Sequence, residues 1–246
     1  MEHLESKSGL DHPSLLALSR KRARGTRSRF ASFALKRKIR SLLLLCALAC
    51  PLAAHAGAQV REPLSESARL TLRKAVSDSA SLRLAFASEA EAQAWISEMS
   101  QRLQRRMPDE FMRVRFLKTL HYEATRAGLD PQLVLGLVEV ESGFHKYAVS
   151  SASARGYMQV MPFWTKEIGN GNDNLFEMRT NLRFGCTILR YYLDKEKGNL
   201  FRALGRYNGS LGRAEYPKMV AGAWRSRWAY PAPSTTAERE KADRPG

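Results

Sequence analysis

Glu141 ends an apolar stretch, and its residue type and position suggest chemistry more directly than those of any other side chain. It lies in Val-Glu-Val-Glu-Ser-Gly-Phe (138–144), immediately before a serine and a glycine. A carboxyl group removed from water resists ionisation, so it can stay protonated near neutral pH and act as a general acid. The alternative is a structural glutamate that is buried because it pairs with one of the chain's many arginines.

Two clusters that follow Glu141 carry side chains able to hold a polar substrate. Arg-Gly-Tyr-Met-Gln-Val-Met-Pro (155–162) contains Gln159, whose amide both donates and accepts hydrogen bonds. Arg-Tyr-Asn-Gly-Ser (206–210) contains Tyr207, whose hydroxyl could hold a carboxyl group and whose ring could stack on a sugar. Taken alone, the first cluster is a turn that enters a helix, and the second is a helix end.

The segment that carries Glu141 has the start and stop signals of a helix. Asp130-Pro131 places a capping side chain before a proline, and Gly143 follows the last apolar residue. The residues between them are apolar on almost every side, which predicts a central, buried helix. Glu141 shares the face of the apolar residues three, four and seven positions before it, whereas Glu139 points elsewhere.

The rest of the chain predicts an all-α fold, because helical spacing recurs and no alternating strand pattern appears. The sequence also leaves room for a small β-hairpin near 145–160. Residues 57–80 are polar, and we expect them to be loosely ordered. Phe111, Val114, Leu117 and Leu120 recur at helical intervals and are expected to face inward. Further helices are expected at 84–107 (with Ala85, Ala92, Ile96, Met99 and Leu103 inward), 109–127, 162–168, 181–193, 199–207 and 217–224.

The N-terminal region has the three parts of a secretory signal peptide. Lys36-Arg37-Lys38 forms the charged part, residues 41–52 the apolar part, and Ala54-His55-Ala56 a small-x-small cleavage site. The apolar run is shorter than the roughly 20 residues of a membrane-spanning helix. We therefore expect an exported, periplasmic protein cleaved near Ala56; a buried helix is the alternative.

The segment before this signal is longer than an ordinary leader, so the true start is expected near residue 35. Cys50 could carry a lipid anchor, but the residues before it match the lipoprotein pattern poorly. Cys186 is the only cysteine after Ala56, so it cannot form an internal disulfide and is expected to be a small buried residue.

The formal net charge of +16 is divided evenly at the expected cleavage site. Residues 1–56 hold 11 Lys/Arg and 3 Asp/Glu, so the remainder carries about +8. That surplus favours an anionic partner such as a cell-wall polymer, a membrane surface or a nucleic acid. No zinc-finger or RNA-binding motif supports the nucleic acid. His121 and His145 lack partners at metal-ligand spacing, so we expect neither a metal nor a cofactor.

Four motifs in sequence resemble the soluble lytic transglycosylase (SLT) domain family. They are Glu-Ser-x-Phe, Gly-x-Met-Gln-x-Met-Pro, Asn-x-x-x-Gly-x-x-x-Leu (Asn181, Gly185, Leu189) and Tyr-Asn, and the resemblance covers about residues 112–225. It implies a lysozyme-like all-α domain, similar to goose-type lysozyme. The expected organisation is a leader (1–56), a linker and helical arm (57–108), a catalytic domain (109–230) and a disordered tail (231–246).

Carried over residue by residue, the resemblance makes Glu141 the catalytic acid and then base. The positions that it implies for substrate binding are Ser142, Met158, Gln159, Tyr207 and Asn208. The chain departs from the family pattern around the groove but at no reacting group. This chain has Tyr157 where the family usually has Leu, Ser153 in place of Gly, Arg206 in place of Ala, and Gly209-Ser210 in place of Ala-Gly.

The resemblance implies non-hydrolytic cleavage of the MurNAc-β-1,4-GlcNAc bond of peptidoglycan, which leaves 1,6-anhydromuramoyl ends. A hydrolytic muramidase on the same fold and a non-catalytic wall-binding module are the alternatives. Peptidoglycan strands are the expected partner, with an envelope-spanning secretion or conjugation machine as a further candidate, and a monomer is expected. Endo versus exo cleavage and the role of the 84–107 arm stay open.

Overall fold

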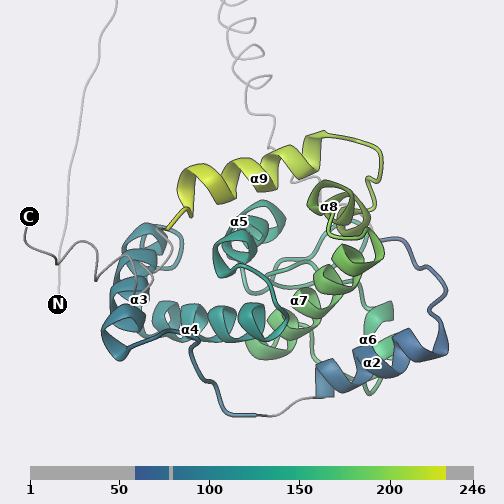
Figure 1. The fold of residues 1–246 in the computed structure, drawn as a ribbon, viewed down its shortest axis with the longest axis horizontal. Coiled ribbons are helices and arrows are strands. Elements are labelled where there is room, and N and C mark those ends of the chain that lie inside the picture. Colours follow the sequence, from purple (N-terminus) through teal and green to yellow (C-terminus); the bar gives the residue numbers. More distant parts are fainter. Residues whose placement is uncertain (1–58, 78–79, 231–246) are drawn as a thin grey trace, which may run out of the picture. The chain divides into compact units, whose positions relative to one another are not determined.

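The computed structural model describes residues 59–77 and 80–230. The expected signal peptide, the alternative start, Cys50 and the 231–246 tail lie outside these residues. Within the described ranges the chain forms eight helices and no extended strand, so the all-α prediction is confirmed (Figure 1). Two isolated β-bridges, Val149 with Arg155 and Arg155 with Val160, occur in the region where the sequence allowed a small hairpin.

Several of the helices begin where a capping side chain accepts a hydrogen bond from a free backbone N–H group. Asp109, Asp130 and Asn199 act in this way before three of the helices. The bounds are α2 Glu66–Ser77, α3 Glu89–Leu103, α4 Glu110–Arg126, α5 Pro131–Ser142, α6 Phe163–Ile168, α7 Met178–Lys195, α8 Leu200–Asn208 and α9 Glu215–Arg227.

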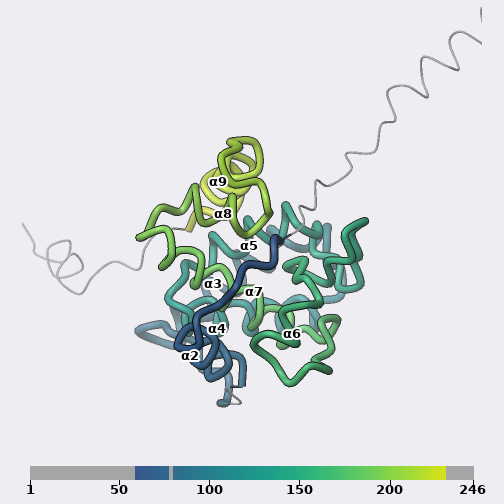
Figure 2. Tube along the Cα trace, turned by 90° about the vertical axis from the view of Figure 1, so that its right-hand side faces the viewer, coloured from purple at the N-terminus to yellow at the C-terminus, as the bar shows by residue number. Residues whose placement is uncertain are grey.

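Helix α5 is the central helix, as its apolar sequence predicts. It lies between α9 on one side and α4 on the other, and both views show this order (Figures 1 and 2). Gly136 lets α9 approach closely, because a Cβ atom at this position would lie 2.8 Å from the backbone nitrogen of Trp224. Residues Leu133 to Val138 are buried on all sides, and each buried Leu or Val stabilises the fold by about 1.5–3 kcal/mol.

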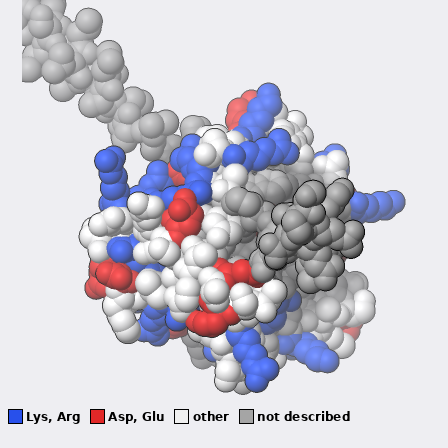
Figure 3. Space-filling view, turned by 60° about the vertical axis from the view of Figure 1, so that its left-hand side comes forward, with Lys and Arg blue, Asp and Glu red and all other residues white. Residues whose placement is uncertain are grey.

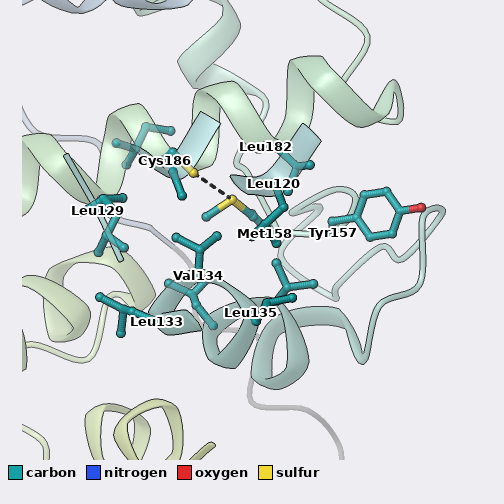
Figure 4. Close-up of a cluster of buried hydrophobic side chains, with 14 of the residues drawn as sticks. Leu120, Leu129, Leu133, Val134, Leu135, Tyr157, Met158, Leu182 and Cys186 are labelled. Atoms are coloured by element: carbon teal, nitrogen blue, oxygen red, sulfur yellow. Dashed lines mark hydrogen bonds between the residues drawn. The ribbon is translucent and has the colours of Figure 1, made fainter. Parts of the chain in front are cut away.

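A second close approach joins the turn at 155–161 to α7. Gly185 faces Met158, and a Cβ atom there would lie 2.4 Å from the Met158 sulfur. The Met158 side chain thereby inserts into the apolar cluster between α5 and α7, where its sulfur lies 4.0 Å from Cys186 Sγ (Figure 4). Cys186 is fully buried, as the sequence predicts.

The expectation that residues 57–80 are loosely ordered is wrong, because Glu66–Ser77 form α2. This helix packs on α7 and α6. Leu72 and Val76 lie four positions apart and are buried. Two apolar residues in a polar segment are a weak periodic signal, so the contact with α7, distant in sequence, decides the structure here.

The arm predicted at 84–107 is shorter than expected and packs on α4. Ser88 caps the helix through the N–H of Glu91, so Ala85 lies before the helix and is exposed. Trp95, which the sequence analysis did not select, is buried against the ring of His121 at a centroid distance of 5.0 Å. Helix α3 is therefore part of the packed core.

The inward face of α4 also differs from the prediction. Phe111 was expected to face inward, but it is 73% exposed, and Phe116 is buried instead. Residue 111 lies in the first turn on the exposed side of the helix, and the first buried residue of α4 is Arg113, two positions later.

Glu123 of α4 is a fully buried carboxylate held by three arginines. Its oxygens lie 2.9 Å from Arg126 Nε, 3.1 Å from Arg179 Nε and 3.1 Å from Arg183 Nη2. Arg126 and Arg183 also donate to the carbonyl oxygens of Ala75 and Val76, at the end of α2. The cluster therefore ties α2 to α4 and α7 by charge-assisted hydrogen bonds.

Much of the positive charge is locally neutralised in this way. The face in Figure 3 shows basic side chains scattered among neutral and acidic ones rather than gathered into one patch. In the part of the chain that the structure describes, no helix has the length and hydropathy needed to cross a bilayer.

Candidate active site

Glu141 lies in the last turn of α5, where the sequence placed it. Gly143 ends the helix in the left-handed conformation, with φ +57°. The Glu141 side chain is only 5% exposed. It therefore sits where the chain turns from the buried helix into the loop that carries residues 145–151.

Glu141 is not a structural ion-pair residue. Within residues 59–77 and 80–230, no Lys, Arg or His forms a salt bridge with it, whereas Glu139, two residues earlier, pairs with Arg106 at 2.7 Å and Arg227 at 2.8 Å. The contact that Glu141 does make is with Tyr216 of α9, whose hydroxyl donates a hydrogen bond of 2.5 Å to Oε1. The alternative of an arginine-paired glutamate thus applies to Glu139 and Glu123, not to Glu141.

Burial raises the pKa of Glu141 to about 8, and the Tyr216 hydrogen bond acts in the opposite direction. Removal from water disfavours the carboxylate, and no cation compensates for that loss. The group is therefore protonated at neutral pH. A protonated carboxyl group at a pocket wall has the form that a general acid needs.

A pocket of about 710 Å³ opens beside Glu141. Glu141 is the only carboxylate among the residues that line it. The lining residues are Glu141, Ser142, His145, Lys146, Tyr147, Ala148, Val149, Ser150, Ser151 and Gln159.

Two of the expected substrate-binding residues share this pocket with Glu141. Gln159 has a left-handed backbone, φ +48°, and its amide donates to Gly156 O at 2.9 Å. Ser142 Oγ donates to Tyr157 O at 2.7 Å. Both side chains thus also hold the turn that forms one wall of the pocket.

The other three expected residues are buried away from the pocket lining. Met158 is 0% exposed within the core, so its side chain does not line this pocket. Tyr207 donates its hydroxyl to Met158 O at 2.7 Å, so it supports the turn and does not hold the carboxyl group. Asn208 is buried at the end of α8. Their motifs predicted proximity to the site, but close packing turns these side chains inward.

Tyr216 is the contact residue that the sequence analysis missed. It lies 75 positions after Glu141 and outside the recognised motifs. Its nearest sequence signal is its place just before Pro217, at the start of a helix. Only the packing of α9 on α5 brings the two side chains together.

Asn181 of α7 organises the pocket wall from behind. Its Oδ1 accepts from Met158 N at 2.8 Å, while Nδ2 donates to Arg155 O and Leu175 O, both at 2.8 Å. The side chain is fully buried. Gly156 makes room for it, since a Cβ atom there would lie 2.4 Å from Asn181 Nδ2.

Comparison with known proteins agrees with this arrangement. Residues 118–223 match the family model described as "Transglycosylase SLT domain". This part of the chain is similar to the SLT domain family. It begins within α4 and ends within α9, so Glu141, Asn181 and Tyr216 all lie inside it.

Curated relatives carry the same name. The chain is 32% identical over 99 residues to "Transglycosylase" of Enterobacteria phage PRD1, which covers 40% of this chain and 36% of the relative. It is 37% identical over 90 residues to "Membrane-bound lytic murein transglycosylase C" of Glaesserella parasuis serovar 5 (strain SH0165). That alignment covers 33% of this chain and 25% of the relative. The chain is also 44% identical over 114 residues to the protein of that name from Haemophilus influenzae (strain PittEE). That alignment covers 40% of this chain and 32% of the relative.

The similarity is therefore confined to part of each protein. In these three alignments, the chain spans about a quarter to a third of the relative's length. No solved structure gives a significant match to the chain.

The Tyr216→Phe variant of the SLT domain tests the hydrogen bond to Glu141. The hydroxyl stabilises the carboxylate, so its loss should raise the Glu141 pKa further above about 8. The measurement is a titration of the glutamate side-chain carboxyl by ¹³C NMR. Tyr147→Phe is the matched control, because Tyr147 is exposed and lies in the same pocket. An unchanged or lowered Glu141 pKa in Tyr216→Phe would contradict the assignment.

Proposed function

We propose that this chain is a peptidoglycan lytic transglycosylase whose SLT domain cleaves the β-1,4 bond between MurNAc and GlcNAc. The observation that carries the proposal is one buried, uncharged carboxyl group, Glu141, in a pocket lined by no second carboxylate. The names of the curated relatives, transglycosylase and lytic murein transglycosylase, support the same activity.

In the proposed reaction Glu141 acts first as an acid and then as a base. It donates its proton to the glycosidic oxygen as the bond from that oxygen to the muramoyl C1 breaks. The resulting carboxylate takes the proton of the C6 hydroxyl of the same sugar, and O6 bonds to C1. The products are a new GlcNAc 4-hydroxyl and a 1,6-anhydromuramoyl end, with no water consumed. Glu141 ends the cycle protonated.

The lone carboxylate favours this route over hydrolysis. A hydrolytic glycosidase uses a second carboxylate, about 5 Å away as nucleophile or roughly 6.5–9.5 Å away as base for water. The nearest glutamate in sequence, Glu139, is held by Arg106 and Arg227. An intramolecular hydroxyl needs no second carboxylate, because the substrate supplies the nucleophile. A hydrolytic muramidase and a non-catalytic wall-binding module are the competing functions.

The residues around Glu141 fall into two groups in this proposal, those that line the pocket and those that are buried behind it. Ser142 and Gln159 face the glycan, because they line the pocket with Glu141. Met158 and Tyr207 support the pocket wall from within the fold, since the Tyr207 hydroxyl donates to Met158 O, and Asn208 is buried at the end of α8. Tyr216 holds the carboxylate form of Glu141 during the second half of the reaction.

The proposed place of action is the cell envelope. Relatives of the SLT domain are named membrane-bound. We propose export to the periplasm by a signal peptide cleaved near Ala56, and an envelope-spanning secretion or conjugation machine as a candidate partner.

Digestion of purified peptidoglycan followed by mass spectrometry tests the function. We expect anhydromuropeptides, which are lighter than the hydrolytic products by one water. Reducing muropeptides would replace the proposal by a muramidase. Binding of peptidoglycan without any cleavage product would replace it by a wall-binding module.

A further inference from the structure

Two aromatic rings, each near a cation, lie together at the Glu141 pocket: Tyr147 lines the pocket, and Phe176 lies beside Tyr147 outside the lining. Tyr147 is 71% exposed, and its ring centroid lies 5.9 Å from that of Phe176. Lys146 Nζ lies 5.0 Å from the Tyr147 centroid, and the Arg155 guanidinium carbon lies 5.8 Å from that of Phe176. These four residues form a continuous surface that we call the aromatic–cation platform.

The platform is built from three segments, residues 146–147, 155 and 176, that the fold fixes against one another. The Asn181 amide donates to Arg155 O and to Leu175 O, so one buried side chain holds the second and third segments. Gly156 N donates to Ala148 O at 2.9 Å, which ties the first segment to the second. Asn174 Oδ1 accepts from Phe176 N at 2.9 Å, which fixes the approach to α7. A surface held by buried hydrogen bonds is preorganised and loses little entropy when it binds a ligand.

The two cations of the platform are not neutralised by the protein. Across residues 59–77 and 80–230, neither Lys146 nor Arg155 forms a salt bridge, in contrast to the arginines around Glu123 and Glu139. The one carboxyl group lining the pocket, Glu141, is uncharged at neutral pH because its pKa is about 8. Lys146 in the pocket lining and Arg155 on the platform beside it therefore make this surface positive, which favours an anionic ligand.

We propose that the platform binds the peptide-bearing muramoyl unit of the glycan, with Tyr147 against the sugar ring and Lys146 and Arg155 on carboxylates of the stem peptide. This inference rests on the proposed function and names the form of the substrate that the site prefers. Aromatic faces pack on the C–H face of a sugar, and cations beside them add charge attraction to carboxylates. A glycan strand without stem peptides still offers a sugar to the Tyr147 ring, but it offers no stem-peptide carboxylate to Lys146 and Arg155.

The test compares kcat/KM on stem-bearing strands and on strands denuded by an amidase. Two exposed charge contacts predict a preference for stem-bearing strands of roughly tenfold in the wild type, which corresponds to about 1.4 kcal/mol. The double variant Lys146→Met/Arg155→Met should lose most of that preference, because its kcat/KM on stem-bearing strands falls toward its kcat/KM on denuded strands. Lys118→Met/Lys218→Met removes two exposed lysines elsewhere and should keep the preference.

Tyr147→Ala separates the sugar contact from the charge contacts, since it should lower kcat/KM on both substrates. Equal cleavage of both substrates by the wild type, or a preference that survives in Lys146→Met/Arg155→Met, would overturn the inference and leave the proposed function standing.

Binding of the two strand types by Glu141→Gln gives a readout that does not depend on turnover. If the wild type cleaves neither substrate, the proposed function fails. Tighter binding of stem-bearing strands, abolished by Lys146→Met/Arg155→Met, would then still support the platform, and equal binding of both strands would overturn it.

Discussion

Replacing Glu141 with glutamine should abolish glycan cleavage while leaving the fold intact. Glutamine has the same shape and can still accept the Tyr216 hydrogen bond, but it has no proton of suitable acidity to donate. The loss of one general acid–base group lowers the rate by about 10²–10⁴-fold. The measurement is the rate of anhydromuropeptide release, with Glu110→Gln, an exposed residue in the first turn of α4, as the matched control. Substantial residual activity in Glu141→Gln would move the acid–base role to another residue.

The same substitution should change how stability depends on pH. The Glu141 pKa is about 8 in the folded protein and near the ordinary glutamate value of 4.5 when the chain is unfolded. The folded state therefore binds the extra proton between these values, and its stability is lost as pH rises from about 4.5 through 8. Glutamine does not titrate, so the Glu141→Gln variant should gain stability relative to wild type across this window. Parallel unfolding curves of the two proteins at all pH values would contradict a buried, unpaired Glu141.

Glu123→Gln should have the opposite consequence and strongly destabilise the fold. Glu123 is fully buried and neutralises Arg126, Arg179 and Arg183. Two of these arginines, Arg126 and Arg183, in turn hold the end of α2. Removing one partner of a buried ionic cluster costs about 3–5 kcal/mol, because charges are left without compensation. The measurement is the free energy of unfolding from chemical denaturation at neutral pH.

The matched control for this prediction is Glu98→Gln. Glu98 pairs with Arg102 one turn away on an exposed helix face, at 2.7 Å. Such surface pairs contribute about 0.3–0.5 kcal/mol. Similar losses in the two variants would mean that the Glu123 cluster contributes no more than an ordinary surface ion pair.

The sequence alone was sufficient for the fold class and for the position of Glu141. The start of α5 at Asp130-Pro131 and its end at Gly143 are local backbone signals, so no distant contact is needed to read them. The apolar residues between them place Glu141 on a buried face for the same reason. Local signals failed at α2, which has only two buried apolar residues, and at Phe111, which lies on the exposed side of α4.

The tertiary structure alone decided the environment of the site. Sequence offers many arginines near each glutamate, and only packing leaves Glu141 without one while Glu123 receives three. Packing also supplies Tyr216 from 75 positions away and turns Met158 into the core. The charge of a buried carboxyl group depends on all the groups around it, and these come from helices far apart in the chain. Residue order therefore determined which group could react, and the assembly of α5, α7 and α9 determined the state in which it is held.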